Sequence, residues 1–350
     1  MRFNWKKWNI FVLLLFFIFI SPVISLNYIV DPMWSFNHSI VIGQRQAAFD
    51  ERQQKTNWLT FHSEDFNTVI FGDSRVTYLE PHSMPSKAFN YSLSSMRPVE
   101  FPAYLSYASQ RSKSPIDVVV LGLSFHQTNA SNEMTYKKPE FYIKKSNELG
   151  YRLELLLSAK LALYSLELIK DKQKKSPQDF YLRKGKDLYA HQMDLPIPKN
   201  IFEEAMKADL EIYRTKVYGE NYQYTDNLIF FREMLDEFPN ARFIVFTTPV
   251  SSHLIKLLVK QGHFADYERW LRDLVNVFGE VWHFMYLNEI TLDDDNFKDA
   301  HHFSNKVANI IAAKIFENKN NIHFNFGIKI TRETIEKDLD FLKDNLLFVK

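Results

Sequence analysis

Two short stretches of the sequence contain side chains suited to nucleophilic catalysis. The first is Gly72-Asp73-Ser74-Arg75, which directly follows the apolar run TVIF. A serine placed where a parallel strand turns into a helix is exposed at the carboxyl edge of the sheet, where open α/β sheets build their sites. A neighbouring base can activate its hydroxyl, and its own N–H can face a developing oxyanion. Ser74 is therefore a candidate nucleophile, although Gly-Asp-Ser also forms ordinary turns.

The second stretch is Asp299-Ala300-His301-His302, which precedes a predicted helix. A carboxylate three residues before a histidine can reach one ring nitrogen and fix the tautomer of the ring. The other nitrogen is then free to take a proton from a serine. By itself, such a pair is also typical of a polar loop and helix cap. Whether this pair is catalytic therefore depends on whether the fold places it beside Ser74.

The elements that must position these residues alternate between strands and helices. Short β-branched and aromatic runs are followed by longer helical patterns, which is typical of an α/β domain with a parallel sheet. The runs VVVLGL and FIVFT are apolar throughout, as expected of strands covered on both faces. The predicted strands are 68–72, 88–91, 117–123, 241–247 and 281–287. The clearest predicted helices are 151–172, 201–218, 250–260, 304–316 and 331–347.

The order of these elements predicts that the two stretches meet. Gly-Asp-Ser follows the first strand of the sheet, and the Asp/His pair follows the last. In a flavodoxin-like order, 2-1-3-4-5, both strand ends project at the same edge of the sheet. We therefore expect a three-layer α/β/α fold that brings Ser74, Asp299 and His302 together.

Composition excludes several classes of function. The chain has 350 residues, of which 46% are hydrophobic, so it can bury a core and is not disordered. Its 43 Lys and Arg balance 42 Asp and Glu, which disfavours a nucleic-acid partner. The absence of cysteine rules out disulfides, Fe–S clusters and thiol nucleophiles. No metal or nucleotide motif occurs, so we expect no metal and no cofactor, and we interpret Asp293–Asp295 as an acidic surface loop.

The N-terminal segment decides where the protein works. Residues 10–30 carry no charged side chain and are long enough to span a bilayer. Basic residues precede this segment, which predicts a cytoplasmic N-terminus and an extracytoplasmic main domain. A cleaved signal peptide is the competing interpretation, with a mediocre cleavage site at Val23–Ser25. A buried helix of a soluble protein is the third.

The rest of the chain divides around the predicted sheet. The strands at 117–123 and 241–247 are too far apart for a simple crossover connection. The predicted segments are a cytoplasmic N-terminus at 1–9, a signal anchor at 10–30, a polar and irregular lead-in at 31–66, an α/β core at 67–126 and 241–317, a helical insert at 127–240 and a strand-helix extension at 318–350.

The combination of Gly-Asp-Ser after the first strand and an Asp/His pair after the last strand resembles the SGNH/GDSL hydrolase superfamily. This superfamily comprises esterases and acyl-transferring enzymes with a three-layer α/β/α fold. The resemblance covers residues 67–126 and 241–317. The apolar segment followed by NYIVDP (27–32) also resembles bacterial membrane-anchored members of that superfamily.

The resemblance assigns roles to the residues already singled out. The first block of the family ends in GxSR, which Gly72, Ser74 and Arg75 match, with Asp73 between them. It implies that Ser74 is the nucleophile, that His302 is the general base and that Asp299 orients it. His301 is out of register, so we expect it to be solvent-facing or structural.

The oxyanion hole departs from the family pattern. The second block usually supplies a glycine N–H, and the equivalent here is Ser95, with Ser94 as the alternative. A serine can replace that glycine only where the backbone does not need a positive φ. The third block has its glycine, Gly122, but Ser124 follows in place of an asparagine, and Asn129 lies further along.

We expect an oxyanion hole formed by Ser74, Ser95 and Ser124 that is less complete than in secreted lipases of the superfamily. The loss of one donor typically lowers the rate about 100- to 1000-fold. The sequence is therefore consistent with slow ester turnover and with an inactive protein.

The resemblance implies a membrane-anchored, extracytoplasmic serine esterase or O-acyltransferase. Its substrates would be acetyl or other acyl esters of cell-surface glycans, and its partners would include the membrane and other surface-polysaccharide machinery. The alternative is a catalytically decayed scaffold that binds surface polysaccharide or helps to assemble it.

Overall fold

The computed structural model describes residues 5–37, 45–47, 50–62, 65–132, 135–170, 182–184, 197–316 and 326–347. Some sequence predictions fall outside these residues. They concern residues 1–4 of the basic N-terminus, 171–181 and 185–196 of the insert, and 317–325 at the start of the C-terminal extension.

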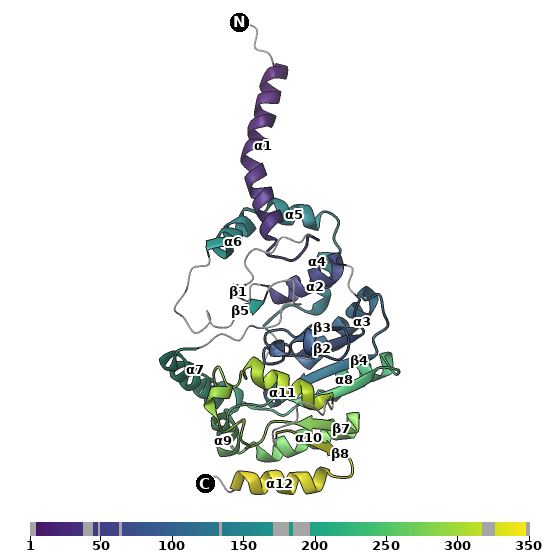
Figure 1. Ribbon diagram of the computed structural model, residues 1–350, viewed down its shortest axis with the longest axis vertical. Helices are drawn as coiled ribbons and strands as arrows, with labels where there is room; N and C mark the ends of the chain where they lie inside the picture. The colour runs from purple at the N-terminus through teal and green to yellow at the C-terminus, as the bar shows by residue number, and fades with distance from the viewer. Residues whose placement is uncertain are drawn as a thin grey trace.

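A six-stranded, mostly parallel sheet lies at the centre of the molecule (Figure 1). Its order is β3-β2-β4-β6-β7-β8, with β8 antiparallel to β7. The strands are β2 (Thr68–Gly72), β3 (Ala88–Asn90), β4 (Val118–Leu123), β6 (Arg242–Thr247), β7 (Glu280–His283) and β8 (Ile328–Thr331).

This sheet differs from the predicted order 2-1-3-4-5. The prediction had five parallel strands, whereas the C-terminal extension adds β8 as a sixth strand at the edge beside β7. The last parallel strand is also shorter than predicted, since it ends at His283 and not at Leu287. The other four predicted strands occur within two residues of their expected bounds.

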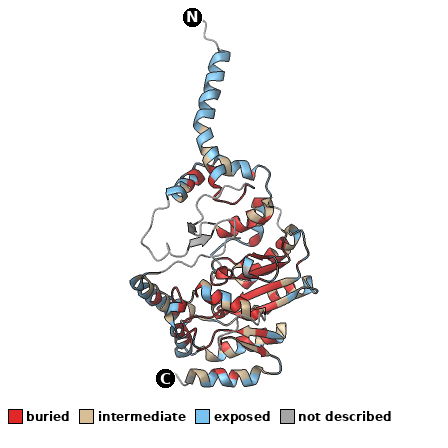
Figure 2. Ribbon diagram, in the orientation of Figure 1, coloured by how far each residue is buried: buried red, intermediate tan, exposed pale blue. Residues whose placement is uncertain are grey.

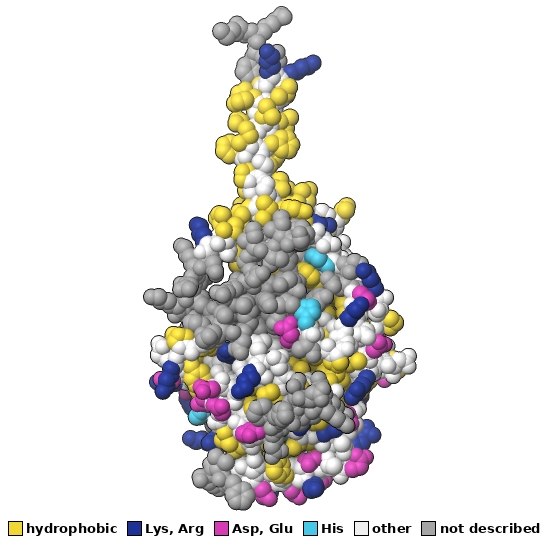
Figure 3. All heavy atoms as spheres, viewed as in Figure 1, with side chains coloured by type: hydrophobic (Ala, Val, Ile, Leu, Met, Phe, Trp, Pro, Cys, Tyr) yellow, Lys and Arg dark blue, Asp and Glu magenta, His cyan; other side chains and the backbone are white. Residues whose placement is uncertain are grey.

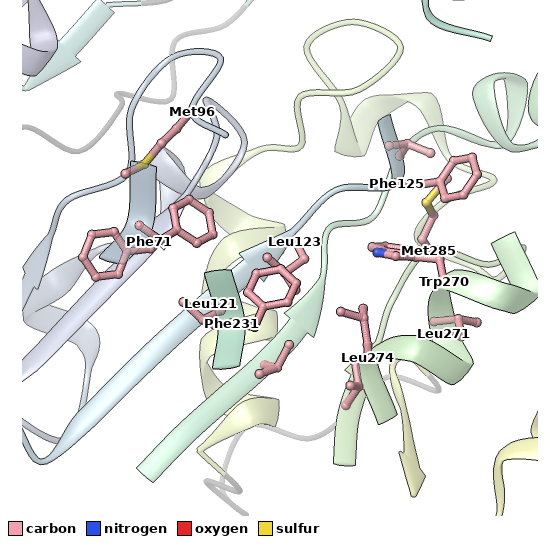
Figure 4. Close-up of a cluster of buried hydrophobic side chains, with 14 of the residues drawn as sticks. Phe71, Met96, Leu121, Leu123, Phe125, Phe231, Trp270, Leu271, Leu274 and Met285 are labelled. Atoms are coloured by element: carbon pink, nitrogen blue, oxygen red, sulfur yellow. The ribbon is translucent and has the colours of Figure 1, made fainter. Parts of the chain in front are cut away.

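Helices pack on both faces of the sheet, because alternate residues of each buried strand point to opposite faces. In β2, Phe71 joins one hydrophobic cluster and Ile70 joins the other. Figure 4 shows the first cluster, where Leu121 and Leu123 of β4 meet aromatic and aliphatic side chains of α8 and α10. The helices of this region are α3 (Phe101–Arg111), α8 (Leu228–Glu237), α9 (Ser252–Lys260), α10 (Phe264–Phe278), α11 (Asn305–Ile315) and α12 (Ile335–Leu347).

The predicted insert is mostly helical where the structure describes it. The single helix predicted at 151–172 is wrong, because the chain becomes extended at Ser158 and forms two helices. A short antiparallel pair, β1 (Arg45–Ala47) with β5 (Leu182–Lys184), was not predicted. The helices are α4 (Pro139–Ser146), α5 (Tyr151–Leu157), α6 (Ala159–Lys170) and α7 (Lys199–Ile212), which a π-helical turn at Tyr213–Val217 extends.

The N-terminal helix α1 (Trp5–Val30) projects from the rest of the molecule (Figures 1 and 2). It is the one helix among the described residues that is long and apolar enough to span a membrane. Its apolar stretch is not covered by the rest of the chain, which contradicts the interpretation as a buried helix of a soluble protein. The same length and hydropathy fit a signal sequence.

The predicted irregular lead-in is wrong for residues 51–61, which form helix α2 (Glu51–Phe61). The polar run that reads as a loop is almost completely buried here, from Glu51 to Asn57. Buried polar groups need partners, and α2 finds them in neighbouring segments. The Nζ of Lys55, for example, donates to the carbonyls of Asn90 and Ser92 at 2.8 and 2.6 Å.

Candidate active site

The turn that carries Ser74 packs directly onto the sheet. Gly72 at the end of β2 pairs with Gly122 of β4. A Cβ at either position would collide with the side chain of Val76, in the 3₁₀ turn that follows Ser74. Neither glycine has a positive φ. Gly72 is therefore needed because a Cβ at this position would not fit between the strand and the turn that carries Ser74.

Ser74, His302 and Asp299 form a continuous hydrogen-bonded chain. The Oγ of Ser74 lies 2.7 Å from Nε2 of His302. The Nδ1 of His302 lies 2.6 Å from Oδ2 of Asp299. The other oxygen of Asp299 accepts the backbone N–H groups of His301 and His302, at 2.8 and 2.7 Å. These bonds fix the carboxylate on the loop that carries the histidine.

The two neighbouring histidines have opposite pKa shifts. Burial lowers the pKa of His302 below its usual value, and the charge of Asp299 does not offset it. Burial also acts on His301, but Asp299 and Asp209 together raise the pKa of His301 above its usual value. Burial would raise the pKa of Asp299, yet the two histidines hold it well below its usual value. The ring beside Ser74 is thus neutral and can accept a proton.

His301 binds a helix of the insert, so it is not solvent-facing. Its Nδ1 lies 2.9 Å from the carboxylate of Asp209 in α7 and 3.5 Å from that of Asp299. Its role is therefore the structural one of the two that we expected. Asp299, His301 and His302 have ligand atoms within 4.8 Å of one another and are the described group that could hold a metal ion. The Nε2 of His302, however, is directed at Ser74.

Arg75 and Asp73 form a buried network behind the nucleophile. The Nη1 of Arg75 lies 3.1 Å from Oδ2 of Asp73 and donates to Nδ1 of His126 at 2.8 Å. Its Nε donates to the carbonyl of His301 at 3.1 Å, and its Nη2 to the hydroxyl of Tyr213. Arg75 thus joins the nucleophile turn, the histidine loop and the insert, and acts as a positioning residue.

The segment that contains Ser95 lies beside the nucleophile strand. The Leu93 N–H donates to the Gly72 carbonyl at 3.1 Å. Ser95 has a φ of 52°, in the left-handed region that favours glycine. Among the described residues, none accepts a hydrogen bond from the N–H of Ser74 or of Ser95. Both groups therefore remain available to an oxyanion. The N–H of Ser94 does not, because Glu51 accepts it at 2.8 Å.

Ser124, the predicted donor after β4, and Asn129 further along the chain both have other partners. The N–H of Ser124 donates to Oε1 of Gln127 at 3.0 Å, and its hydroxyl lies 2.8 Å from that of Thr248. The amide of Asn129 donates to the carbonyl of Val217 at 2.9 Å. Ser124 stays a prediction as an oxyanion donor, but these contacts favour a supporting role for both residues.

Sequence reasoning missed three residues of the site. His126 lies two residues after Ser124, where a polar residue past a strand end could have been noticed. Asp209 and Tyr213 come from the insert, far along the chain, and no local pattern marks them. The expected surface position of the acidic run Asp293–Asp295 is confirmed, since Asp293 and Asp295 are exposed.

Comparisons with protein-family models and with curated proteins give no match to this chain. The functional assignment therefore depends on the geometry of the site and on the resemblance of its motifs.

Proposed function

We propose that the chain is a serine esterase or O-acyltransferase of the SGNH type, with a flavodoxin-like sheet as its core. One observation carries the proposal, namely the continuous hydrogen bonding from Ser74 through His302 to Asp299. A serine, a neutral imidazole and a buried carboxylate in this order constitute the apparatus of acyl transfer. The residues come from two loops far apart in the sequence, so local turn formation does not explain their meeting.

The reaction follows from these contacts. The Oγ of Ser74 attacks the acyl carbonyl while its proton passes to Nε2 of His302, and Asp299 stabilises the resulting imidazolium. The N–H groups of Ser74 and Ser95 hold the oxyanion. When the C–O bond breaks, His302 returns the proton to the leaving alcohol. The acyl-enzyme then passes its acyl group to water or to a sugar hydroxyl.

The setting of the reaction is part of the same proposal. Helix α1 would anchor the chain, with its basic N-terminus in the cytoplasm and the α/β domain on the other side. The substrate class, acyl and especially acetyl esters of cell-surface glycans, follows from the motif resemblance. Contact with other surface-polysaccharide proteins would be consistent with this setting.

The test uses the full chain in detergent micelles, with p-nitrophenyl acetate as substrate and a fluorophosphonate probe. We expect slow ester turnover and labelling of the wild type, because an activated serine reacts with both reagents. Ser74→Ala should lose labelling and fall to the uncatalysed rate. Ser106→Ala, on helix α3, is the matched control and should behave as the wild type.

A second candidate function is a decayed scaffold that binds or helps to assemble surface polysaccharide. The positive φ of Ser95, where a glycine would be unstrained, favours it. The engagement of Ser124 and Asn129 favours it as well. Equal turnover by wild type and Ser74→Ala, with no fluorophosphonate labelling, would rule out the esterase and support this candidate.

A further inference from the structure

Helices α5 and α6 lie at the base of α1 (Figure 1). Both helices expose apolar side chains. On α6, Leu161, Ala162 and Ser165 are buried on the inner face. The outer face carries Leu163, which is 65% exposed. We call the exposed apolar residues of this region the collar, which comprises Leu149, Leu153, Leu157, Leu163, Leu166 and Ile169.

A buried asparagine attaches the collar helices to α1. The amide of Asn27 donates to the carbonyls of Leu155, Leu156 and Ser158 at 3.0, 3.0 and 2.9 Å, which satisfies the end of α5. The hydroxyl of Ser165, on α6, lies 3.5 Å from the Asn27 side-chain oxygen. Both helices are therefore fixed at the level of Asn27.

The length of α1 places Asn27 at the edge of a bilayer that α1 spans. A hydrocarbon core of about 30 Å takes about 20 helical residues at 1.5 Å per residue. Counted from Trp8, the residue after Lys7, these residues end near Asn27. The continuously exposed stretch of α1 stops at Phe19, about 17 Å from Trp8 by the same rise. A full span must therefore include the part of α1 that packs against α5 and α6.

The exposed apolar surface is continuous from α1 to its base. Figure 3 shows hydrophobic side chains along the projecting helix and on the shoulders directly beneath it. Helix α6 also exposes Lys160, Glu167 and Lys170, so charged and apolar groups are both accessible on the same short helix. This mixture is typical of helices that lie in the plane of a membrane interface. An apolar patch of this kind exposed to water would be unfavourable.

We propose that the collar binds lipid, with α5 and α6 lying in the interface of the leaflet at the C-terminal end of α1. The inference depends on α1 being a membrane anchor, but not on the catalytic proposal. It goes beyond anchoring, because two more helices at the membrane would fix the orientation of the α/β domain relative to the bilayer. A free tether would leave that orientation open.

The absence of cysteine permits a direct test, because a single introduced cysteine gives a single labelling site. The full chain is reconstituted into phosphatidylcholine vesicles with a minor share of phosphatidylglycerol. An environment-sensitive fluorophore is attached at Leu163→Cys, in the collar, or at Phe16→Cys, in α1. Ile229→Cys, on α8, is the matched control because it is 69% exposed and apolar.

We expect blue-shifted emission at positions 163 and 16, and loss of intensity at both when brominated acyl chains are included. The label at position 229 should show neither effect. Quenching at 16 but not at 163 would overturn the collar. A blue shift at 163 without quenching would also overturn it, because the label would then lie against protein of this chain or of a second copy and not against lipid. No quenching at 16 would overturn the anchor and the collar together. Leu166→Cys repeats the test should Leu163→Cys fail to fold.

Discussion

At the scale of single residues, environment and not residue type separates the roles of His301 and His302. The two rings are adjacent, with their centroids 4.0 Å apart. His301 faces the carboxylates of Asp209 and Asp299, so its pKa is raised. His302 contacts the carboxylate of Asp299, but it is buried beside Ser74, and this burial lowers its pKa. The second carboxylate, that of Asp209, therefore explains why two adjacent histidines have pKa shifts of opposite direction.

The tautomer of His302 should control the rate. In Asp299→Asn, the amide can still accept the backbone N–H groups of the loop, but it no longer holds a proton on Nδ1 of His302. We expect kcat/KM for p-nitrophenyl acetate to fall about 10⁴-fold. Asp209→Asn changes a carboxylate that contacts His301, which is not the ring beside Ser74, and it should lower kcat/KM far less. Similar losses in both variants would contradict the assigned roles.

The backbone at Ser95 should be strained. A non-glycine residue in the left-handed region costs about 1 kcal/mol relative to glycine. We expect Ser95→Gly to raise the free energy of unfolding by about that amount while the ester turnover is kept. Ser94→Gly is the control, because Ser94 has no positive φ and glycine there should not stabilise. Denaturant unfolding of the two variants measures the difference, and equal effects would argue against strain at Ser95.

At the scale of elements, helix α2 supports the loop that carries Ser95. Glu51 accepts the Ser94 N–H at 2.8 Å, and Arg52 donates to the Ser94 carbonyl at 3.0 Å. Arg52 also forms a buried bidentate pair with Glu100, at 2.8 and 2.9 Å. The peptide next to Ser95 is thus held from both sides by charged groups of one helix. This explains why a strongly polar helix is buried in this fold.

Breaking the buried pair should be costly. Arg52→Met leaves the Glu100 carboxylate buried without its cation, and we expect the free energy of unfolding to fall by about 3–5 kcal/mol. Adding Glu100→Gln should recover part of this loss, because an uncharged amide costs less to bury. Chemical denaturation of the wild type, the two single variants and the double variant gives a double-mutant cycle. If the two losses simply add, the pair is not coupled.

At the scale of the whole molecule, a buried histidine links the sheet to its covering helices and makes stability depend on pH. His283, at the end of β7, lies 2.9 Å from the Thr247 hydroxyl and 2.5 Å from that of Tyr267 in α10. Burial lowers the pKa of His283 to about 3. The folded chain therefore keeps this ring neutral at a pH where the unfolded chain protonates it.

The sign of the pH effect follows from that difference. Below pH 6.5 the unfolded state binds one more proton at His283, so stability falls as the pH drops towards 3 and is unaffected above 6.5. The slope for one proton is about 1.4 kcal/mol per pH unit. Denaturant unfolding between pH 7 and pH 4.5 should show a shallower slope in His283→Gln than in the wild type. Identical slopes would mean that His283 is not buried and neutral.

The sequence alone predicted the five parallel strands of the central sheet, most of the helices and the pairing of Ser74 with Asp299 and His302. These predictions depend on local patterns, namely apolar runs, strand ends and a carboxylate three residues before a histidine. The lead-in was wrong because Glu51–Asn57 reads as a solvated loop, and only its partners make burial favourable. Likewise, no local pattern could show that the backbone at Ser95 is left-handed.

The sequence by itself determined which reactive groups the chain contains: no thiol, a serine in a Gly-Asp-Ser turn after a strand, an Asp/His pair and an apolar N-terminal segment. The tertiary structure decided the rest. It brought Asp209 and Tyr213 from the insert to His301 and Arg75, turned α2 into a support, and placed α5 and α6 around the end of α1. The physical reason is that burial, charge and hydrogen bonding between distant segments exist only once the chain has packed.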